Sequence, residues 1–388
     1  MSGAPQNSGF NKLRVAKIGE KSFSDLAESW CALLKQSNAD PLFMSWTWLF
    51  SWWATWGHDL GLELLLLEVI DQKANLVGIA PLYRHRYRTP VGISVGRLHF
   101  LGNAWRIGDT VRTEYVGLIA HQGFEESVAE AVASYLRSEP WDEMVICDAS
   151  RESLGWLKCG FQKVGQEVSE VPRDQAAGIC IHTAGNFENW LSFLGRNTRL
   201  KAYNRRKVFE NEHGGTEKVV GSSRSERESF FEYLNDMHVR RWGKPCFGQK
   251  AVTFHLDFLE RLSSDQAARL SLLKYNGRVV AAQYDVEAGR RRYNLQSGFE
   301  EHFDKRISLG TLHMGYAIES AFRDPQIENY DLLAGEGKNT FYKEHYKGEH
   351  VGFYTRHYTR NRLLRLVYRW QVYLPGAVRR VLNRAFRL

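Results

Sequence analysis

The residues best suited to bind an anion lie in a short loop that leads directly into a predicted helix. The loop reads Arg306-Ile-Ser308-Leu-Gly310-Thr311, and apolar residues recur at helical spacing over Leu309–Phe322, with Ser308 at the N-cap position. The first amides of a helix have no partner inside the helix, and the helix dipole is positive at that end. We therefore predict that this small, polar segment binds a pyrophosphate or another anion.

The loop lies within a stretch of predicted strands and turns that must position it. Asn276-Gly277 is a strong signal for a two-residue hairpin, and polar or glycine-containing turns separate the other runs. Period-two or continuous apolar runs predict strands over 270–275, 279–287, 291–299 and 329–337. The order strand, hairpin, strand, strand, loop, helix, strand places the anion loop beside the end of a strand.

This order, with two short strings, resembles the core of the acyl-CoA N-acyltransferases (GNAT). In that family a loop reading roughly Arg/Gln-x-x-Gly-x-Gly/Ala holds the coenzyme A pyrophosphate, and here Arg306 and Gly310 fit it. The strings from Asp331 to Glu336 and from Phe341 to Lys343 resemble the ending "D-F-x-x-G … Y-K-x-x-W" of the cellulose-biosynthesis acetyltransferases (CelD/BcsL-like). More distantly, they resemble the FemX-like peptidoglycan aminoacyl transferases.

The resemblance implies a site for acetyl-CoA as the acyl donor. In the GNAT pattern the donor threads between two splayed strands, here 291–298 and 329–334, where backbone amides hold the thioester carbonyl. The donor-binding residues that follow are Ser297, Gly298, Arg306, Ser308, Gly310 and Thr311.

Acyl transfer also requires a base for the nucleophile and protonation or stabilisation of the leaving thiolate. By the same resemblance, Glu336 or Asp331 is the base and Tyr342 is the acid. Lys343 neutralises charge on the donor or acceptor, as a lysine in this region does in FemX-like proteins.

Two basic segments are candidates for binding the acceptor. Arg205 belongs to a cluster of basic residues over 196–207, within a helix predicted over 187–211, and Arg241-Trp242 ends a helix predicted over 224–242. These residues either face a phosphorylated donor or acceptor in a groove between domains, or form a solvated basic surface.

The N-terminal half repeats the same plan of hairpin, strands, helix and strand over 62–148, with one of its strands predicted over 113–120. We therefore predict an α/β (α+β) protein of two tandem GNAT-like modules, each a mixed, mostly antiparallel sheet flanked by helices. The predicted domains are 1–185, 186–355 and a basic tail, 356–388. A tryptophan-rich helix predicted over 43–56 is either core or a stacking platform for a sugar or base.

The net charge of +8 is concentrated in the tail. Residues 356–388 hold nine arginines and no acidic residue, and the rest of the chain has 43 Lys and Arg against 44 Asp and Glu. A near-neutral body does not favour nucleic acid as a partner. The five cysteines show no metal-binding spacing, and the N-terminal sequence has no signal-peptide pattern, so we expect no metal and a cytoplasmic protein.

The tail alternates arginines with apolar residues and is broken at Pro375-Gly376. This pattern is typical of a basic amphipathic helix on an anionic membrane surface. Docking on an acidic partner, or on the protein itself, is the alternative.

Together these observations predict an acyltransferase at the inner face of the cell membrane. The resemblance implies that its donor is acetyl-CoA and that its acceptor is the amine or hydroxyl of a sugar, as a small molecule or linked to a lipid, in envelope or exopolysaccharide synthesis. Two alternatives stay open. One is a FemX-like aminoacyl transferase that uses aminoacyl-tRNA, and the other is a non-catalytic, membrane-tethered partner of a polysaccharide synthase.

Overall fold

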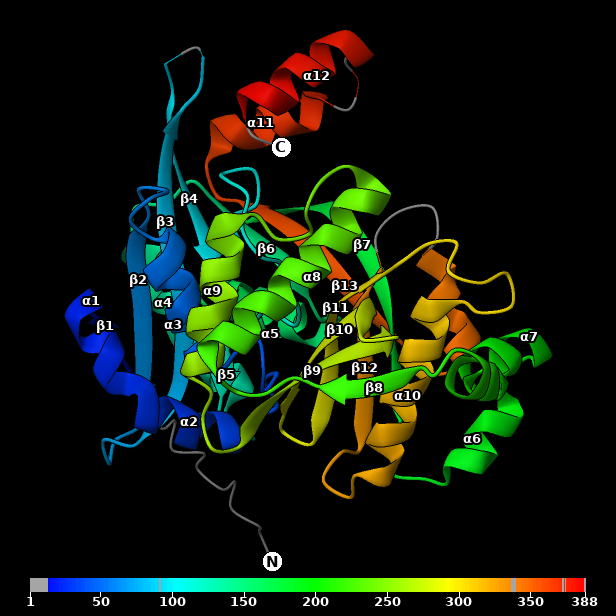
Figure 1. The fold of residues 1–388 in the computed structure, drawn as a ribbon. Coiled ribbons are helices and arrows are strands. Elements are labelled where there is room, and N and C mark those ends of the chain that lie inside the picture. The colour runs from blue at the N-terminus through cyan, green and yellow to red at the C-terminus, as the bar shows by residue number, and fades with distance from the viewer. Residues whose placement is uncertain (1–12, 91, 336–339, 372, 374, 387–388) are drawn as a thin grey trace, which may run out of the picture. The chain divides into compact units, whose positions relative to one another are not determined.

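The computed structural model describes residues 13–90, 92–335, 340–371, 373 and 375–386, and Figure 1 shows its elements. The contacts divide the chain into two compact units. The first comprises Met1–Asp174 together with Tyr354–Leu388, and the second comprises Gln175–Phe353. The structure thus groups the predicted tail with the N-terminal unit, whereas the sequence suggested a separate segment.

The first unit is built on a sheet in the order β1-β2-β3-β4-β6-β13. Its neighbours are antiparallel except for β4 and β6, which are parallel, and β5 pairs with β3. The strands are β1 Arg14–Ile18, β2 Glu63–Ile70, β3 Leu76–Arg88, β4 Ser94–Phe100, β5 Ile119–Ala120, β6 Glu143–Ala149 and β13 Glu349–Thr359. The helices are α1 Glu20–Phe23, η1 Ser24–Leu26, α2 Ala27–Lys35, α3 Trp46–Trp56, α4 Glu125–Ser138, α5 Arg151–Lys163, α11 Arg362–Gln371 and α12 Gly376–Ala385.

The second unit has a sheet in the order β7-β12-β11-β10-β9-β8. Only β11 and β12 are parallel. The strands are β7 Ser169–His182, β8 Thr216–Val219, β9 Gln266–Tyr275, β10 Arg278–Ala288, β11 Arg291–Phe299 and β12 Asn329–Ala334. The helical elements are α6 Phe187–Phe193, α7 Arg196–Arg199, η2 Leu200–Asn204, η3 Val208–Glu212, α8 Arg224–Trp242, α9 Gln249–Glu260, α10 Leu309–Arg323 and η4 Thr340–Tyr346.

The two sheets follow one plan, which confirms the predicted fold class of two tandem modules. Each has a run of antiparallel strands, then a parallel strand, then an antiparallel strand. The last strand of each sheet comes from an unexpected place in the sequence. β6 of the first unit pairs with residues 354–359 of β13, and β12 of the second unit pairs with residues 178–182 of β7.

The local signals that set the second unit are visible in the backbone. Asn276 and Gly277 both have positive φ, 47° and 77°, as a two-residue turn between β9 and β10 requires. Ser223 caps α8 by accepting a hydrogen bond from the amide of Glu226, and Gly243 ends that helix in the left-handed conformation. The predicted hairpin and the helix 224–242 are therefore confirmed.

Two predicted elements differ from the structure, and one strand was not predicted. The single helix expected over 187–211 is broken at Leu194-Gly195, where both residues are extended, and it continues as α7 and the π-helical segments η2 and η3. The strand expected over 113–120 is reduced to β5. The segment 349–359, which carried no prediction, is the strand β13. β13 forms because it pairs with β6, which is distant in the sequence, and such tertiary pairing overrides the local pattern.

The tryptophan-rich helix α3 is part of the core of the first unit. Trp48, Trp52, Trp53 and Trp56 are each at most 3% exposed, and the indole of Trp48 donates to the Thr113 hydroxyl at 2.8 Å. The core interpretation is therefore correct, and these four rings are not available as a stacking platform.

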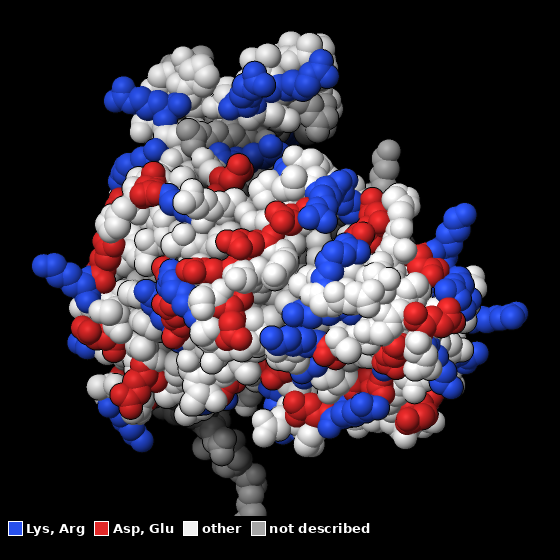
Figure 2. All heavy atoms as spheres, viewed as in Figure 1, with Lys and Arg blue, Asp and Glu red and all other residues white. Residues whose placement is uncertain are grey.

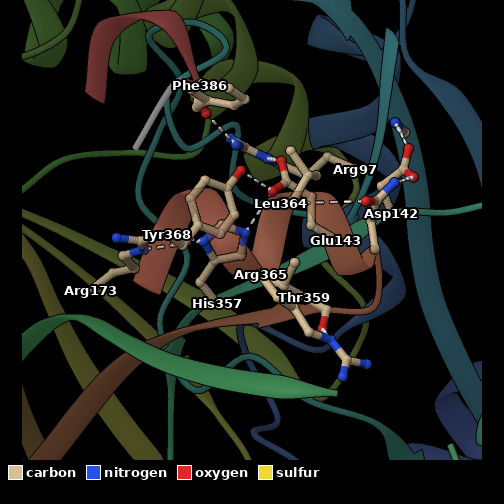
Figure 3. Close-up of polar contacts among 12 residues, drawn as sticks. Arg97, Asp142, Glu143, Arg173, His357, Thr359, Leu364, Arg365, Tyr368 and Phe386 are labelled. Atoms are coloured by element: carbon tan, nitrogen blue, oxygen red, sulfur yellow. Dashed lines mark hydrogen bonds and ion pairs between the residues drawn. The ribbon is translucent and has the colours of Figure 1, made fainter. Parts of the chain in front are cut away.

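The tail forms two helices, α11 and α12, with the break at Pro375-Gly376 that the sequence predicts. Its inner face reaches a buried charged cluster (Figure 3). There the Glu143 carboxylate accepts hydrogen bonds from Arg97 at 2.6 Å, His357 at 2.9 Å and Tyr368 at 2.6 Å. Arg97 also donates to the backbone carbonyl of Phe386 at 2.7 Å. Within the described part of the chain, none of the helices has the length and apolar character needed to span a membrane.

Candidate functional site

An opening between two parallel strands defines the candidate site in the second unit. β11 and β12 are paired only from Arg291 to Tyr293 and from Asn329 to Asp331, although β11 continues to Phe299. The register of β11 against β10 shifts at Tyr284/Asp285, which indicates a bulge that bends the strand. The two strands therefore separate beyond their third pair, as the sequence resemblance implied for the donor site.

Asp331 and Lys343 fix the end of β12 on one side of this opening. The buried carboxylate of Asp331 accepts from the amide of Leu333 at 2.8 Å, and Leu333 has a positive φ of 59°. The Lys343 ammonium, which is 8% exposed, donates to the carbonyls of Leu332, Leu333 and Ala334 at 2.6, 3.0 and 2.9 Å. These bonds hold β12 in its irregular course away from β11.

The N-terminus of α10 lies at the loop predicted to bind an anion. Ser308 is at the N-cap position, but its hydroxyl contacts that of Thr311 at 3.0 Å and makes no capping bond. The amides of Leu309, Gly310 and Thr311 have no hydrogen-bond acceptor among the described residues. The first turn of α10 carries no acidic residue. Free amides, two hydroxyls and the helix dipole together favour an anion here.

The first unit provides an internal comparison. Its helix α4 occupies the same place in the strand plan, between β4 and the parallel strand β6. The first turn of α4 carries Glu125 and Glu126. Their carboxylates offset the positive end of the helix dipole, so that, of these two helices, α10 has the uncompensated N-terminus.

Arg306 is held by carboxylates of its own unit. Its guanidinium contacts Asp304 at 3.0 Å and Glu212 at 2.8 Å, and its amide also donates to Asp304 at 2.7 Å. These contacts hold the pKa of the Asp304 carboxyl well below its usual range. A pyrophosphate bound at the loop would therefore have to compete with two carboxylates for Arg306.

Residues of α8 and α10 meet at the last residue of β11. The Arg241 guanidinium lies 4.6 Å from the Phe299 ring centre and 4.7 Å from the ring of Trp242, and it pairs with Glu301 at 2.9 Å. A Cβ on Gly310 would lie 2.4 Å from the Phe299 ring, so only glycine permits this approach. Trp242 is 60% exposed. The predicted acceptor residues Arg241 and Trp242 thus lie beside the predicted donor residue Gly310.

Two further predicted donor residues, Ser297 and Gly298, contact α8. Through this contact they lie beside His238, a histidine that the sequence reasoning missed. A Cβ on Gly298 would be 3.0 Å from Leu234, and the imidazole Nε2 of His238 donates to the Ser297 carbonyl at 3.0 Å. This bond fixes the tautomer with an unprotonated Nδ1. Partial burial lowers the pKa of His238. The spacing of His238 and Arg241, three residues apart on one helix, was the available signal.

A buried polar network underlies the opening and was also missed. The Asp285 carboxylate accepts from Gln283 at 3.0 Å, from Asn294 at 2.8 Å and from the Tyr330 hydroxyl at 3.0 Å. Burial raises the pKa of Asp285. Because the three strands β10, β11 and β12 each contribute to it, the network fixes the point from which the strands diverge.

Arg205 lies at the joint between η2 and η3, near the middle of α10. Its Nε is buried without a hydrogen-bond partner in the described part of the chain. The neighbouring Arg206 pairs with Glu319 and lies over the ring of Tyr316. Arg206, Tyr316 and Glu319, but not Arg205, border a polar cavity of about 640 Å³ along the C-terminal half of α10. The cavity is therefore distinct from the N-terminal end, where the anion loop lies.

Two predicted catalytic side chains lie outside the described structure. Glu336 is not among the described residues, and for Tyr342 only the backbone, within η4, is described. Their roles as base and acid stay predictions. No group of His, Cys, Asp and Glu side chains suited to a metal ion occurs among the residues that the structure describes.

Comparisons with known proteins agree with this geometry. Residues 196–348 match the family model described as "Acetyltransferase (GNAT) domain", and they include the opening, α8 and α10. This part of the chain is therefore similar to a GNAT acetyltransferase domain. No protein of curated function matches the chain in sequence.

Solved structures resemble the chain over both units. FemX superposes with a TM-score of 0.59 at 13% identity, over 91% of this chain and 99% of FemX. A conserved protein of unknown function from Bacteroides thetaiotaomicron gives 0.55 at 9% identity, over 90% and 100%. The C-terminal domain of a protein described as a lysylphosphatidylglycerol synthetase, from Agrobacterium fabrum, gives 0.50 at 10% identity, over 88% and 93%. At these identities the likeness concerns the fold.

Proposed function

We propose that the second unit transfers an acyl group from an acyl-CoA thioester to an amine or hydroxyl acceptor. The observation that carries the proposal is the opening between β11 and β12 beside the uncompensated N-terminus of α10. An elongated donor with a pyrophosphate at one end and a thioester at the other fits both features. The match of residues 196–348 to a GNAT domain supports the same reaction class.

The donor would be held mainly by backbone groups. The amides of residues 309–311 and the hydroxyls of Ser308 and Thr311 bind the pyrophosphate, and the edge of β11 near Ser297 and Gly298 receives the acyl thioester. Preorganised amides stabilise the negative charge that develops on the thioester oxygen during attack. Acetyl-CoA is the donor that the resemblance favours.

His238 is the proposed general base. Its neutral imidazole, fixed by the bond to the Ser297 carbonyl, has Nδ1 free to accept a proton from the attacking amine or hydroxyl. The lowered pKa keeps this nitrogen unprotonated at neutral pH. Attack forms the new bond to the acyl carbon, and the coenzyme A thiolate leaves with the electron pair of the broken C–S bond. Tyr342 remains the predicted acid for that thiolate.

The acceptor is proposed to be a sugar or sugar-linked amine or hydroxyl in envelope or exopolysaccharide synthesis. The exposed indole of Trp242 beside Arg241 supports this class, because aromatic rings stack on the apolar faces of sugars while arginine binds an attached phosphate. The choice of acceptor otherwise rests on the sequence resemblance.

Transfer of an aminoacyl group from aminoacyl-tRNA is the second candidate. FemX is similar over 91% of this chain, so the likeness includes both units. In addition, Arg306 is already paired with Asp304 and Glu212, so it is less suited to a pyrophosphate than the family loop implies. The two candidates differ in the donor, which can be tested directly.

Calorimetry with the full chain tests the donor. The proposal predicts saturable binding of acetyl-CoA and of coenzyme A. Ser308→Ala together with Thr311→Val should weaken binding about tenfold, because two hydroxyl partners of the anion are lost. Arg306→Gln should change it by less than about threefold, since Arg306 is already paired. If neither acetyl-CoA nor coenzyme A binds but an aminoacyl-tRNA does, the result would favour aminoacyl transfer instead.

A further inference from the structure

The outward face of the tail is a surface that no contact in the described structure covers. Half of the large apolar side chains that are exposed among the described residues fall within 363–381. These side chains are Leu363, Leu366, Trp370, Tyr373, Val378 and Val381, with exposed fractions from 46% to 79%. Both helices contribute to the set, so the surface is a property of α11 and α12 together.

The opposite face of the same helices is already occupied. Leu364, Tyr368 and Phe386 are each at most 5% exposed and pack with Tyr87 and Val95. The tail is therefore docked on its own unit through one face, which was one of the two alternatives for it. The remaining apolar side chains cannot be explained by that docking, because they lie on the other side.

The tail is fixed in place by polar contacts, as Figure 3 shows. Asn361 caps the start of α11 by accepting from the amide of Leu363 at 2.9 Å, and it donates to Asp142 at 2.7 Å. At the other end, Tyr87 and Arg97 donate to the Phe386 carbonyl at 3.1 and 2.7 Å. The exposed surface is thus formed before any partner binds, and binding would not have to bear the cost of ordering a helix.

Charge determines which partner fits this surface. The chain has no acidic residue after Glu349, and in Figure 2 the helices of the tail carry arginines among uncharged residues. The exposed arginines of α11 and α12 include Arg362, Arg369, Arg380 and Arg384. A second copy of the same surface would bring like charges together, so self-association is disfavoured.

We propose that α11 and α12 form a preformed amphipathic surface that binds the headgroup region of an anionic lipid bilayer. The apolar side chains enter the boundary between headgroups and acyl chains, and the arginines contact lipid phosphates. Trp370 and Tyr373, whose ring centres are 6.4 Å apart, have the amphipathic character that suits this boundary. The proposal does not depend on the reaction of the second unit.

Sedimentation of the full chain with vesicles tests the charge requirement. We expect binding to phosphatidylcholine vesicles that contain phosphatidylglycerol, and little binding to pure phosphatidylcholine. Arg369→Gln with Arg380→Gln should weaken binding about 30-fold, from about 1 kcal/mol for each basic side chain. The matched control, Arg196→Gln with Arg290→Gln, removes the same charge from exposed positions of the second unit and should bind as the wild type does.

A second pair of variants tests the apolar requirement. Trp370→Ser should weaken binding to the anionic vesicles about tenfold. Phe193→Ser removes a ring that is 72% exposed in the second unit and should have no effect. Both substitutions are at exposed positions, and circular dichroism would verify that the fold is retained.

Four results would overturn the proposal. One is equal binding to anionic and neutral vesicles. Another is equal loss of binding in the tail variants and their controls. The third is a dimer in light scattering that Trp370→Ser converts to a monomer without vesicle binding, which would assign the surface to a second copy. Binding of polyglutamate as tight as that of the vesicles and unaffected by Trp370→Ser would instead indicate an acidic protein partner.

Discussion

His238 is the residue whose chemistry the structure defines most clearly. Its Nε2 donates to the Ser297 carbonyl, and partial burial lowers its pKa below the ordinary value of about 6.5. A base must be unprotonated to act, so the turnover number should be constant at neutral pH and fall as the pH decreases through this lowered pKa. His238→Ala should reduce the turnover number about 100-fold and abolish this acidic limb.

The measurement for His238 is release of coenzyme A thiol from acetyl-CoA in the presence of a hexosamine, as a function of pH. The Michaelis constant for acetyl-CoA should change by less than about threefold, because His238 is not a pyrophosphate ligand. His350→Ala, at an exposed position of β13, serves as a control. An unchanged pH profile in His238→Ala would show that another group is the base.

Lys343 illustrates how a residue predicted to act on substrate can instead shape the site. Its ammonium donates to three consecutive carbonyls of β12. Lys343→Met would leave these buried carbonyls without a charged donor, and we expect the free energy of unfolding to fall by about 3 kcal/mol. Urea denaturation measures this change, and Lys244→Met, at an exposed loop position, is the control. If the two variants were equally stable, the anchoring role of Lys343 would be refuted.

The buried cluster at β6, β13 and α11 should make the stability of the first unit depend on pH. Arg173 donates to Nδ1 of His357, and Nε2 of His357 donates to Glu143, so the imidazole is neutral. Arg97 and the ring of Tyr368 also face this imidazole. Burial lowers the pKa of His357 to about 4. The pKa of Glu143 is held well below its usual range, chiefly by Arg97.

Both pKa shifts make the folded protein less stable as the pH decreases. Between pH 6.5 and 4 the unfolded chain binds a proton at His357 that the folded chain does not, so stability falls as the pH decreases, by up to about 3 kcal/mol. Glu143 adds to the loss below its unfolded pKa. Urea unfolding followed by tryptophan fluorescence at pH 7 and pH 5 measures the effect. His357→Gln should flatten this dependence, and equal dependence in the variant would contradict the account.

How much of the site could be predicted depends on the kind of contact involved. The hairpin at Asn276-Gly277, the helix α10 and the free N-terminus beside Ser308 follow from local chemistry, and sequence reasoning found them. The pairing of Arg306 with Glu212, and the contact of His238 with Ser297, join segments from separate elements. Propensity and periodicity contain no information on such contacts, so the sequence could only place these residues on their elements.

The whole chain shows the same limit in its topology. The two units share one strand plan, but their last strands are exchanged along the chain. β7, which follows β6 of the first unit, pairs with β12 of the second unit. β13, which follows β12, pairs with β6 of the first unit. A boundary drawn at residue 185 follows the order of elements along the chain, whereas the contacts place the divisions at 174/175 and 353/354. β13 therefore returns the C-terminal segment to the first unit, where α11 and α12 dock.

Hydrogen–deuterium exchange of the full chain, with and without acetyl-CoA, tests the proposed donor site most directly. The account predicts that acetyl-CoA slows exchange of the amides of 309–311 and of the β11 edge near Ser297, because these amides gain acceptors on the donor. The amides at the start of α4, with Glu125 and Glu126 in its first turn, should be unchanged. Binding of acetyl-CoA without protection at 309–311, or with protection at α4 instead, would contradict the account.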